Sequence, residues 1–374
     1  MKSRNRVLSA AAALAVSATM VAGQDFRSET HRPATVGALF TATNGASGNE
    51  VLAFDRLADG HLSPAERVST GGLGTGAGLG NQGALVLSRD ERWLLVVNAG
   101  NDTVSVLDAS RRLRLVDVSS SGGVRPVSVT ESRGVVYVLN AGSDSIAGFK
   151  LTRTGRLTPI PGATRGLSTT GTAPAQVAFT PGGDTLVVTE KATNRIVTFD
   201  VDRDGVAGEA VAQDSNGTTP FGFGFGKRGE LLVSEAFGGA AGASATSSYD
   251  LDRHGLLTTI SPSVATNQTA ACWLAVTPNG RFAYVTNFGS GSISGYRIAF
   301  DGRVELLDAD GRTGVTGEGS SPIDLAIPGS GRYLYSLNSG ARSIGIFRVA
   351  IDGSLAPLPF FAGLPAGLNG LASR

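Results

Sequence analysis

Residues 271–298 read ACWLAVTPNGRFAYVTNFGSGSISGYRI. Two runs rich in Val, Phe and Tyr are joined by the turn Pro278-Asn-Gly-Arg, and a third run follows the small-residue turn after Asn287. β-branched and aromatic residues suit a pleated, half-buried surface, and Asn-Gly and Gly-rich turns supply the positive φ angles of tight hairpins. The stretch therefore predicts three consecutive antiparallel strands.

The same unit recurs along the chain, as a β-rich run that ends in Asn or Glu, a small-residue turn and a second alternating run. We call the residues that end the first run the markers; they are Asn44, Asn98, Asn140, Glu190, Glu235, Asn287 and Asn338. Their mean spacing is about 49 residues, the size of one four-stranded propeller blade. A turn of the Asp-Gly type, such as Asp301-Gly302, then leads into a fourth strand.

The two ends of the repeat fit together. The first copy begins at its second strand, near Val36, and the last residues, from Gly367, read as a missing first strand. We expect an all-β fold over residues 36–374, a seven-bladed propeller of four-stranded antiparallel blades in which the C-terminal strand completes blade 1. Ring closure removes the exposed sheet edges that invite aggregation. A linear solenoid is the alternative.

Composition narrows the class of protein further. The 52 glycines among 374 residues are roughly twice the usual share, which argues against a helical bundle. A net charge of +1 removes any general attraction to nucleic acid or to an anionic membrane. The single cysteine, Cys272, excludes an intrachain disulfide. We expect a monomer whose partner is a small molecule.

The N-terminus has the pattern of an export signal. Lys2, Arg4 and Arg6 precede an apolar, Ala-rich run over residues 7–23, and Val21 and Gly23 are small enough to flank a cleavage site. We interpret residues 1–23 as a signal peptide and 24–35 as a polar leader, and we expect a secreted or periplasmic protein without a membrane span after cleavage. A membrane anchor is the alternative, because the run of about 17 residues is at the lower limit for a span.

The repeats resemble the YVTN-type propellers of the lactonase family, which includes the bacterial 6-phosphogluconolactonase type and fungal carboxymuconate cyclase. Tyr284-Val-Thr-Asn, residues 271–281 and Pro220-Phe-Gly-Phe-Gly-Phe carry the resemblance, which runs from about residue 36 to the end. It implies a seven-bladed propeller with its ligand at the central channel, on the face where the markers lie. It also implies a histidine at the site, yet His61 and His254 fall in hairpin turns and His31 in the leader.

Carboxylates are the candidate catalytic groups. Glu190 and Glu235 replace the usual Asn marker in adjacent blades, and Asp324 lies two residues after the start of an inner strand, at the expected channel mouth. Paired carboxylates serve as acid and base or bind a cation when their pKa values differ. The alternatives are ion pairs of either Glu with Lys191 or Arg195, and a capping bond from Asp324 to Ser320-Ser321.

Other candidates surround the same mouth. Arg125 could hold a carboxylate or a developing oxyanion, and Trp273 offers a flat apolar wall to a ring-shaped ligand. Gln176, Asn369 and Asn287 complete the expected substrate-binding set. A surface arginine, a core tryptophan and turn-bonded asparagines are the structural alternatives.

Taken with the resemblance, which implies a lactone substrate, these residues predict a secreted hydrolase that opens a lactone, with a carboxylate (Asp324, Glu190 or Glu235) activating water and Arg125 stabilising the oxyanion. No cofactor is required, although a divalent cation could replace the arginine. Two alternatives stay open: a non-catalytic propeller that binds a protein, glycan or small ligand, and lactone formation from a muconate-type acid.

Overall fold

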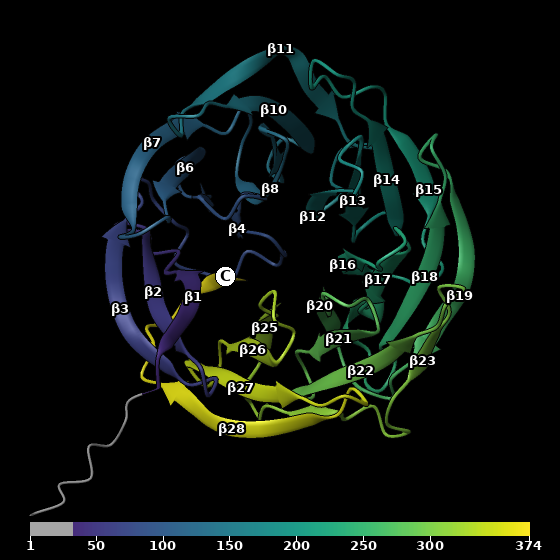
Figure 1. Ribbon diagram of the computed structural model, residues 1–374. Coiled ribbons are helices and arrows are strands. Elements are labelled where there is room, and N and C mark those ends of the chain that lie inside the picture. The colour runs from purple at the N-terminus through teal and green to yellow at the C-terminus, as the bar shows by residue number, and fades with distance from the viewer. Residues whose placement is uncertain (1–32) are drawn as a thin grey trace, which may run out of the picture. The chain divides into compact units, whose positions relative to one another are not determined.

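A computed structural model describes residues 33–374, which form seven antiparallel sheets arranged in a ring (Figure 1). Six sheets have four strands and one has five. The predicted signal peptide and leader residues 24–32 lie outside the described residues. The expected seven-bladed propeller is confirmed.

The blades are numbered from the N-terminus, and each has the same order of strands from the channel outward. The inner strands of blades 1 to 7 are β29 (Asn369–Ser373), β4 (Leu85–Leu87), β8 (Pro126–Ser132), β12 (Pro174–Phe179), β16 (Pro220–Phe225), β20 (Ala271–Val276) and β25 (Pro322–Ala326). The second strands are β1 (Thr35–Ala42), β5 (Trp93–Asn98), β9 (Val135–Asn140), β13 (Thr185–Glu190), β17 (Leu231–Glu235), β21 (Phe282–Asn287) and β26 (Tyr333–Asn338).

The outer half of each blade is more exposed. The third strands are β2 (Glu50–Leu57), β6 (Thr103–Asp108), β10 (Ser145–Leu151), β14 (Arg195–Asp200), β18 (Ala245–Leu251), β22 (Ser292–Ile298) and β27 (Ser343–Val349). The outer strands are β3 (Leu62–Ser69), β7 (Arg114–Ser120), β11 (Leu157–Gly166), β15 (Val211–Asp214), β19 (Leu257–Ala265), β23 (Val304–Leu306) and β28 (Leu355–Ala362). A short strand, β24 (Gly314–Val315), also pairs with β22, and one 3₁₀ turn covers Phe237–Gly239.

Ring closure follows the prediction. β29 pairs antiparallel with β1, so the C-terminal strand is the inner strand of blade 1. Arg56 of β2 donates two hydrogen bonds to the main-chain oxygen of Arg374, at 3.1 and 2.7 Å. The first and last parts of the propeller thereby share one sheet.

Buried tyrosines join neighbouring blades. Tyr137, Tyr284 and Tyr335 lie on second strands and are fully buried. Each hydroxyl donates to a glycine carbonyl in the Asp-Gly-type turn of the next blade around the ring; the acceptors are Gly205, Gly353 and Gly60. A tyrosine buried in this way fills the space between two sheets and still satisfies its hydroxyl.

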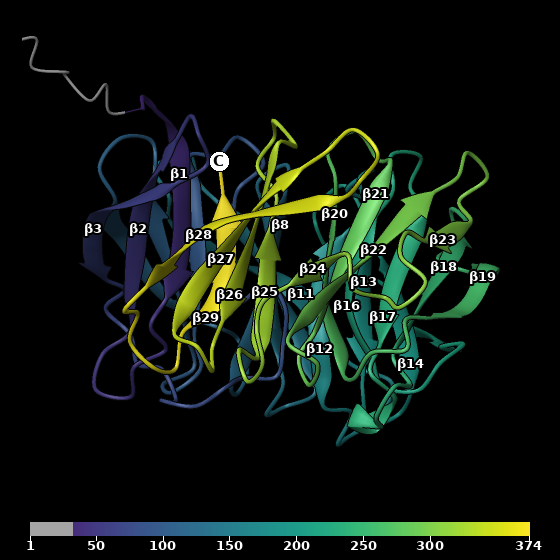
Figure 2. The ribbon, with the colours of Figure 1, turned by 90° about the horizontal axis from the view of Figure 1, so that it is seen from below.

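The two faces of the ring differ in the segments that form them, and Figure 2 shows the strands running between them. The marker face carries the ends of the second strands, where the markers lie, together with the loops that lead into the inner strands. The turn face carries the hairpin turns, such as 88–92, 131–134 and the Asp-Gly-type turns. In the described chain both His61 and His254 lie in turns of the turn face, as predicted.

Candidate functional site

A pocket of about 560 Å³ lies at the channel mouth on the marker face. Its lining is mainly apolar and includes Phe221, Trp273, Ile323 and Leu368 at the beginnings of inner strands or just before them. The Phe221 and Trp273 rings meet at 5.0 Å between centroids, and the Gly-rich segment 76–80 forms another wall. A small, largely apolar molecule with few polar groups fits such a lining.

The channel is crossed by Asn81 and Gln82, which we call the channel plug. Gln82 pairs with the Leu274 backbone in blade 6, accepting its N–H at 3.0 Å and donating to its carbonyl at 2.8 Å. The Gln82 N–H donates to Ala175 in blade 4, and the Asn81 amide donates to Val127 in blade 3. The plug therefore connects opposite sides of the ring beside the pocket.

Two predicted substrate-binding residues hold this plug. The Trp273 indole N–H donates to the Asn81 carbonyl at 2.6 Å, and the Asn369 amide donates to Asn81 Oδ1 at 2.9 Å. Both residues also line the pocket, as the sequence predicted for the channel mouth. The Trp273 indole N–H and the Asn369 amide nitrogen are thus both engaged by the plug.

Lys191 lies at the edge of the pocket, one residue after the Glu190 marker. Its ammonium group donates to the Gly80 carbonyl and lies 4.8 Å from the centroid of the Phe221 ring, and Gly80 and Phe221 both line the pocket. Burial, with a smaller contribution from the nearby Arg125 cation, lowers the pKa of Lys191 to about 8. A lysine with this pKa has an appreciable neutral fraction near neutral pH and can act as a base.

Arg125 is exposed and adopts a left-handed conformation, with φ of 54°, immediately before Pro126. Its backbone N–H donates to Asp102 at 2.6 Å, which fixes the turn from which the side chain extends. Its charge contributes to the lowered pKa of Lys191, although Arg125 itself does not line the pocket.

Asp324 is buried and joins blade 7 to blade 1. One carboxyl oxygen accepts the Leu325 N–H at 2.8 Å and the other accepts the Leu371 N–H of β29 at 3.0 Å. Burial raises its pKa to about 8, more than these two bonds lower it. Its neighbour Ile323 lines the pocket, so Asp324 lies just behind the pocket wall.

Glu190 is fully buried at the end of β13. Its carboxylate accepts the Ser168 N–H at 2.9 Å and the hydroxyl groups of Ser168 and Thr193 at 2.5 and 2.6 Å. These bonds tie the markers' end of blade 4 to the loop that follows β11.

Glu235 occupies the equivalent position in blade 5 and is also fully buried. It accepts the Gly217 N–H at 2.9 Å and the hydroxyls of Ser247 and Ser263 at 2.5 and 2.7 Å. Burial raises its pKa above the ordinary range. The partners of Glu190, Glu235 and Asp324 do not overlap, and no ion pair within residues 33–374 includes either glutamate.

The other predicted binding residues connect strands. Gln176 pairs with the Phe223 backbone of blade 5 through both atoms of its amide, at 3.1 and 2.8 Å. Asn287 donates to Ser292 and Ser294 of β22 at 3.1 and 2.9 Å. Both are buried, so in this conformation neither amide faces the pocket.

Neither a reactive thiolate nor a cluster of metal-binding side chains is found among residues 33–374. Cys272 lines the pocket, but burial raises its pKa to about 12, which keeps it a thiol. Within residues 33–374 no group of three or more His, Cys, Asp or Glu side chains could hold a metal ion. The same residues contain no helix long and apolar enough to cross a membrane.

Sequence reasoning missed Lys191 and the channel plug as features of the mouth. The amide pair Asn81-Gln82, flanked by Gly80 and Gly83, was the available signal for a segment that must approach other backbones closely. Lys191 carried no such signal, because its lowered pKa results from burial and from the Arg125 cation, and its contacts are with Gly80 and Phe221, which are distant in sequence.

Comparison with known proteins supports the resemblance given by the repeats. Residues 47–168 match the family described as lactonase, 7-bladed β-propeller, which confirms the resemblance over that stretch. No curated protein matches the chain.

Solved structures share the fold over most of the chain. A candidate 6-phosphogluconolactonase from Bacteroides fragilis superposes with a TM-score of 0.71 at 17% identity, covering 91% of this chain and 99% of its own. One from Bacteroides uniformis gives 0.71 at 20% identity, with 89% and 98% covered. The periplasmic gluconolactonase of Pseudomonas aeruginosa gives 0.68 at 18% identity, with 89% and 98% covered.

Proposed function

We propose that this protein is a lactonase-type hydrolase that opens a small apolar lactone in the marker-face pocket. The observation that carries the proposal is an apolar pocket of about 560 Å³ with a lysine of pKa about 8 at its edge. The lactonase-family match over residues 47–168 and the lactonases among the structural relatives agree with this reaction class.

Lys191 is the general base in this proposal. Its neutral amine takes a proton from a water molecule as the water attacks the lactone carbonyl, and Arg125 stabilises the negative charge on the carbonyl oxygen. The ring C–O bond then breaks, and the leaving oxygen takes the proton that Lys191 had removed from water, which gives the hydroxy acid and restores the neutral amine. The apolar wall formed by Phe221 and Trp273 holds the rest of the lactone.

A carboxylate base, as inferred from the sequence, would act differently from Lys191. Asp324 is the chain neighbour of the lining residue Ile323, but both of its carboxyl oxygens accept backbone N–H groups and its exposed fraction is 3%. Glu190 and Glu235 are likewise satisfied and buried. Asp324 would have to release a hydrogen bond before it could activate water, so we assign the base to Lys191.

The test is hydrolysis of a panel of lactones, followed by pH-stat titration of the acid released. We expect Lys191→Met to lower kcat/KM by about 100-fold or more. The turn-face lysine variant Lys227→Met should match wild type, and EDTA should have no effect. Full turnover by Lys191→Met contradicts the role of Lys191. Loss of turnover in a folded Asp324→Asn variant, with Lys191→Met active, would assign the base to the carboxylate.

A second candidate function is the binding of a small apolar ligand without turnover. It is favoured because every predicted catalytic carboxylate is hydrogen-bonded within the fold, as structural carboxylates are. If no lactone is hydrolysed while an apolar probe quenches Trp273 fluorescence saturably, this second function replaces the first.

We also propose that the protein is exported, from the pattern of residues 1–23. Cell fractionation, with mass spectrometry of the mature N-terminus, tests this. Cleavage after Gly23 is the expected outcome, and an intact N-terminus retained in the cytoplasm contradicts it.

A further inference from the structure

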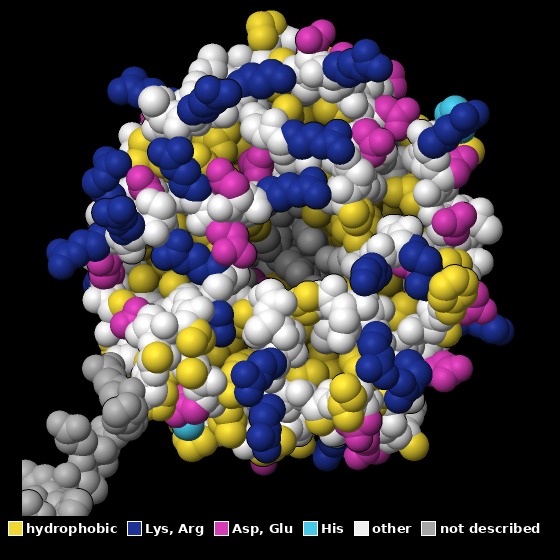
Figure 3. Space-filling model, in the orientation of Figure 1, with side chains coloured by type: hydrophobic (Ala, Val, Ile, Leu, Met, Phe, Trp, Pro, Cys, Tyr) yellow, Lys and Arg dark blue, Asp and Glu magenta, His cyan; other side chains and the backbone are white. Residues whose placement is uncertain are grey.

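The turn face carries a second pocket, on the opposite side of the ring from the channel mouth. Figure 3 shows Lys and Arg side chains gathered on the face that points toward the reader in Figure 1. A pocket of about 410 Å³ lies there between blades 2 and 3. Arg89 and Arg92 of blade 2 and Arg133 and Arg153 of blade 3 line it.

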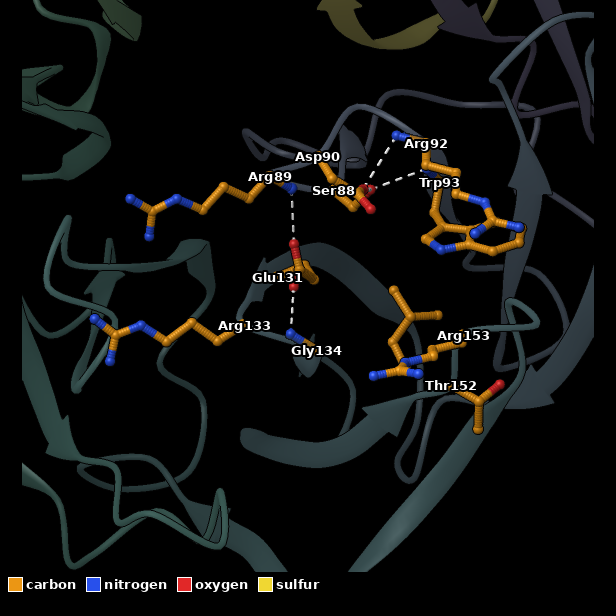
Figure 4. A pocket seen from close by; sticks show the side chains of 11 residues that line it. Ser88, Arg89, Asp90, Arg92, Trp93, Glu131, Arg133, Gly134, Thr152 and Arg153 are labelled. Carbon is orange, nitrogen blue, oxygen red and sulfur yellow. Dashed lines mark hydrogen bonds between the residues drawn. The ribbon is translucent and has the colours of Figure 1, made fainter.

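The two turns that form the pocket are locked together by Glu131. One of its carboxylate oxygens accepts the Arg89 N–H at 2.8 Å, and the other accepts the Gly134 N–H at 2.6 Å (Figure 4). Both bonds are to backbone, so Glu131 positions the turns and leaves the arginine side chains without a carboxylate partner. Figure 4 shows the Arg89 and Arg133 side chains extending from these turns toward the same side.

Blade 2 supplies a rigid wall to the same pocket. The Arg92 guanidinium lies 4.5 Å from the centroid of the Trp93 ring, which is 5% exposed. Asp90 is occupied locally, since it accepts the Ser88 hydroxyl at 2.6 Å and the Arg92 N–H at 3.2 Å. Stacking on an aromatic face orders a guanidinium and leaves its N–H groups available.

The charges of the lining are unbalanced. Four arginines face two carboxylates, Asp90 and Glu131, which gives the lining a net charge of +2. None of the four guanidinium groups forms an ion pair with any carboxylate in residues 33–374. Guanidinium groups bind tetrahedral oxyanions through paired N–H donors, and a dianion would neutralise this net charge.

We propose that the pocket between blades 2 and 3 binds the dianionic oxyanion group of a phosphate or sulfate ester. Arg89 and Arg133, whose side chains extend to the same side of the Glu131 clamp, bind the anion directly. Arg92, which lies against Trp93 on the other side of Glu131 in Figure 4, and Arg153 add to the positive charge of the lining. The apolar lactone pocket on the marker face does not take part, so this site is separate from the proposed hydrolysis.

The experiment titrates inorganic phosphate and inorganic sulfate into the full-length mature protein at low salt, by calorimetry. We expect saturable binding that weakens as NaCl rises, and that weakens at least tenfold in the double variant Arg89→Gln/Arg133→Gln. Arg303→Gln is the matched control, because Arg303 lies on the same face and is paired with Asp301 at 2.7 Å. The single variant Arg153→Gln should also weaken binding, and it serves if the double variant does not fold.

Glycerol phosphate and a sulfated oligosaccharide then distinguish the source of the anion. Tight binding of the first indicates a free small ester, and tight binding of the second alone indicates a sulfated glycan; either outcome supports the site. Unchanged binding in Arg89→Gln/Arg133→Gln, an equal loss in Arg303→Gln, or a linear isotherm for wild type overturns it.

Discussion

The pKa of Lys191 lies within the pH range in which enzyme rates can be measured, so the pH dependence of the proposed reaction tests its role. Burial, opposed in part by Cys272 and assisted by Arg125, lowers its pKa to about 8. Because the neutral amine is the base, kcat/KM should rise with pH through about 8 and level off above it.

Arg125→Gln changes that profile in a defined direction. Removing the neighbouring Arg125 cation stabilises the protonated form of Lys191. The pKa of Lys191 therefore rises, and the inflection in kcat/KM moves to higher pH. The rate at the plateau should also fall, because the oxyanion partner is lost. Arg195→Gln, whose guanidinium faces Asp214 at 3.8 Å, is the control and should leave the inflection in place. An inflection that does not move in Arg125→Gln would contradict the electrostatic effect of Arg125 on Lys191.

Asp324 makes stability depend on pH. Burial raises its folded-state pKa to about 8, whereas an unfolded aspartate has a pKa near 3.9. Between about pH 4 and pH 8 the unfolded chain releases this proton while the folded protein retains it, so the group removes up to about 1.4 kcal/mol of stability for each unit of pH. Below this window its effect vanishes, since both states are protonated.

The variant Asp324→Asn lacks that titration. At pH 5 it should be less stable than wild type, because an amide offers one oxygen to the two backbone N–H groups that Asp324 serves. By pH 8 the difference should shrink or reverse. Urea unfolding of both proteins at the two pH values measures it, and a constant difference would show that Asp324 ionises normally.

The marker residues show what could be predicted at this scale. The structural alternative for Asn44 is confirmed, because it adopts φ of 48° and bonds Thr75 and Ala77 of the Gly-rich loop. Glu190 and Glu235 stood out correctly as exceptions in the repeat. Their hydroxyl partners Ser168, Thr193, Ser247 and Ser263 could not be identified from sequence, because these contacts depend on how loops and outer strands close over each blade.

The loop between β3 and β4 has two roles at the channel mouth. It contributes both the pocket wall at 76–80 and the channel plug at Asn81 and Gln82. The plug needs Gly222 opposite it, because a Cβ atom at that position would lie 2.0 Å from Gln82 Oε1 and 2.6 Å from the Cys272 carbonyl oxygen.

Gly222→Ala should therefore displace the plug. We expect a loss of about 2–3 kcal/mol in the free energy of unfolding, as for other overpacked cores, with altered Trp273 emission. Gly78→Ala is the control in the same loop, because its added Cβ meets nothing within 4 Å, and its cost should stay within about 0.5 kcal/mol. Equal stabilities for the two variants would mean that Gln82 does not fill the channel tightly.

Strand periodicity was sufficient to predict the blades but not this loop. Five inner strands have a register shift just after the first residue; these strands begin at Pro126, Pro174, Pro220, Ala271 and Pro322. Those irregularities re-aim the next side chains, which is why Gln176 and Asp324 bond to the neighbouring blade. A repeat pattern predicts the order of the strands, but it does not predict a local β-bulge within one of them.

For the whole molecule, closure by β29 is the feature that turns seven sheets into one ring. The sequence predicted it from an incomplete first copy and a surplus last strand, and the pairing of β29 with β1 confirms it. Closure also brings Asn369 to the channel plug and Leu371 to Asp324, so three distant segments of the chain meet at the mouth.

Deleting residues 369–374 should open the ring. The edge of β1 would lose its partner, the Asp324 carboxyl would lose the Leu371 N–H, and Asn81 would lose Asn369. We expect a lower melting temperature and association through the exposed edge, seen as larger species in size-exclusion chromatography, where the intact protein should elute as a monomer.

A synthetic peptide of residues 367–374 distinguishes strand closure from a general loss of stability. Added in excess, it should bind beside β1, raise the melting temperature of the shortened protein and return it to the monomeric peak. The same peptide with Leu371→Pro lacks the N–H that Asp324 accepts and should fail to do so. A shortened protein that melts like the intact one would show that pairing of β29 contributes little to the stability of the ring. Equal effects of the two peptides would show that the Leu371 N–H is not needed for the strand to bind.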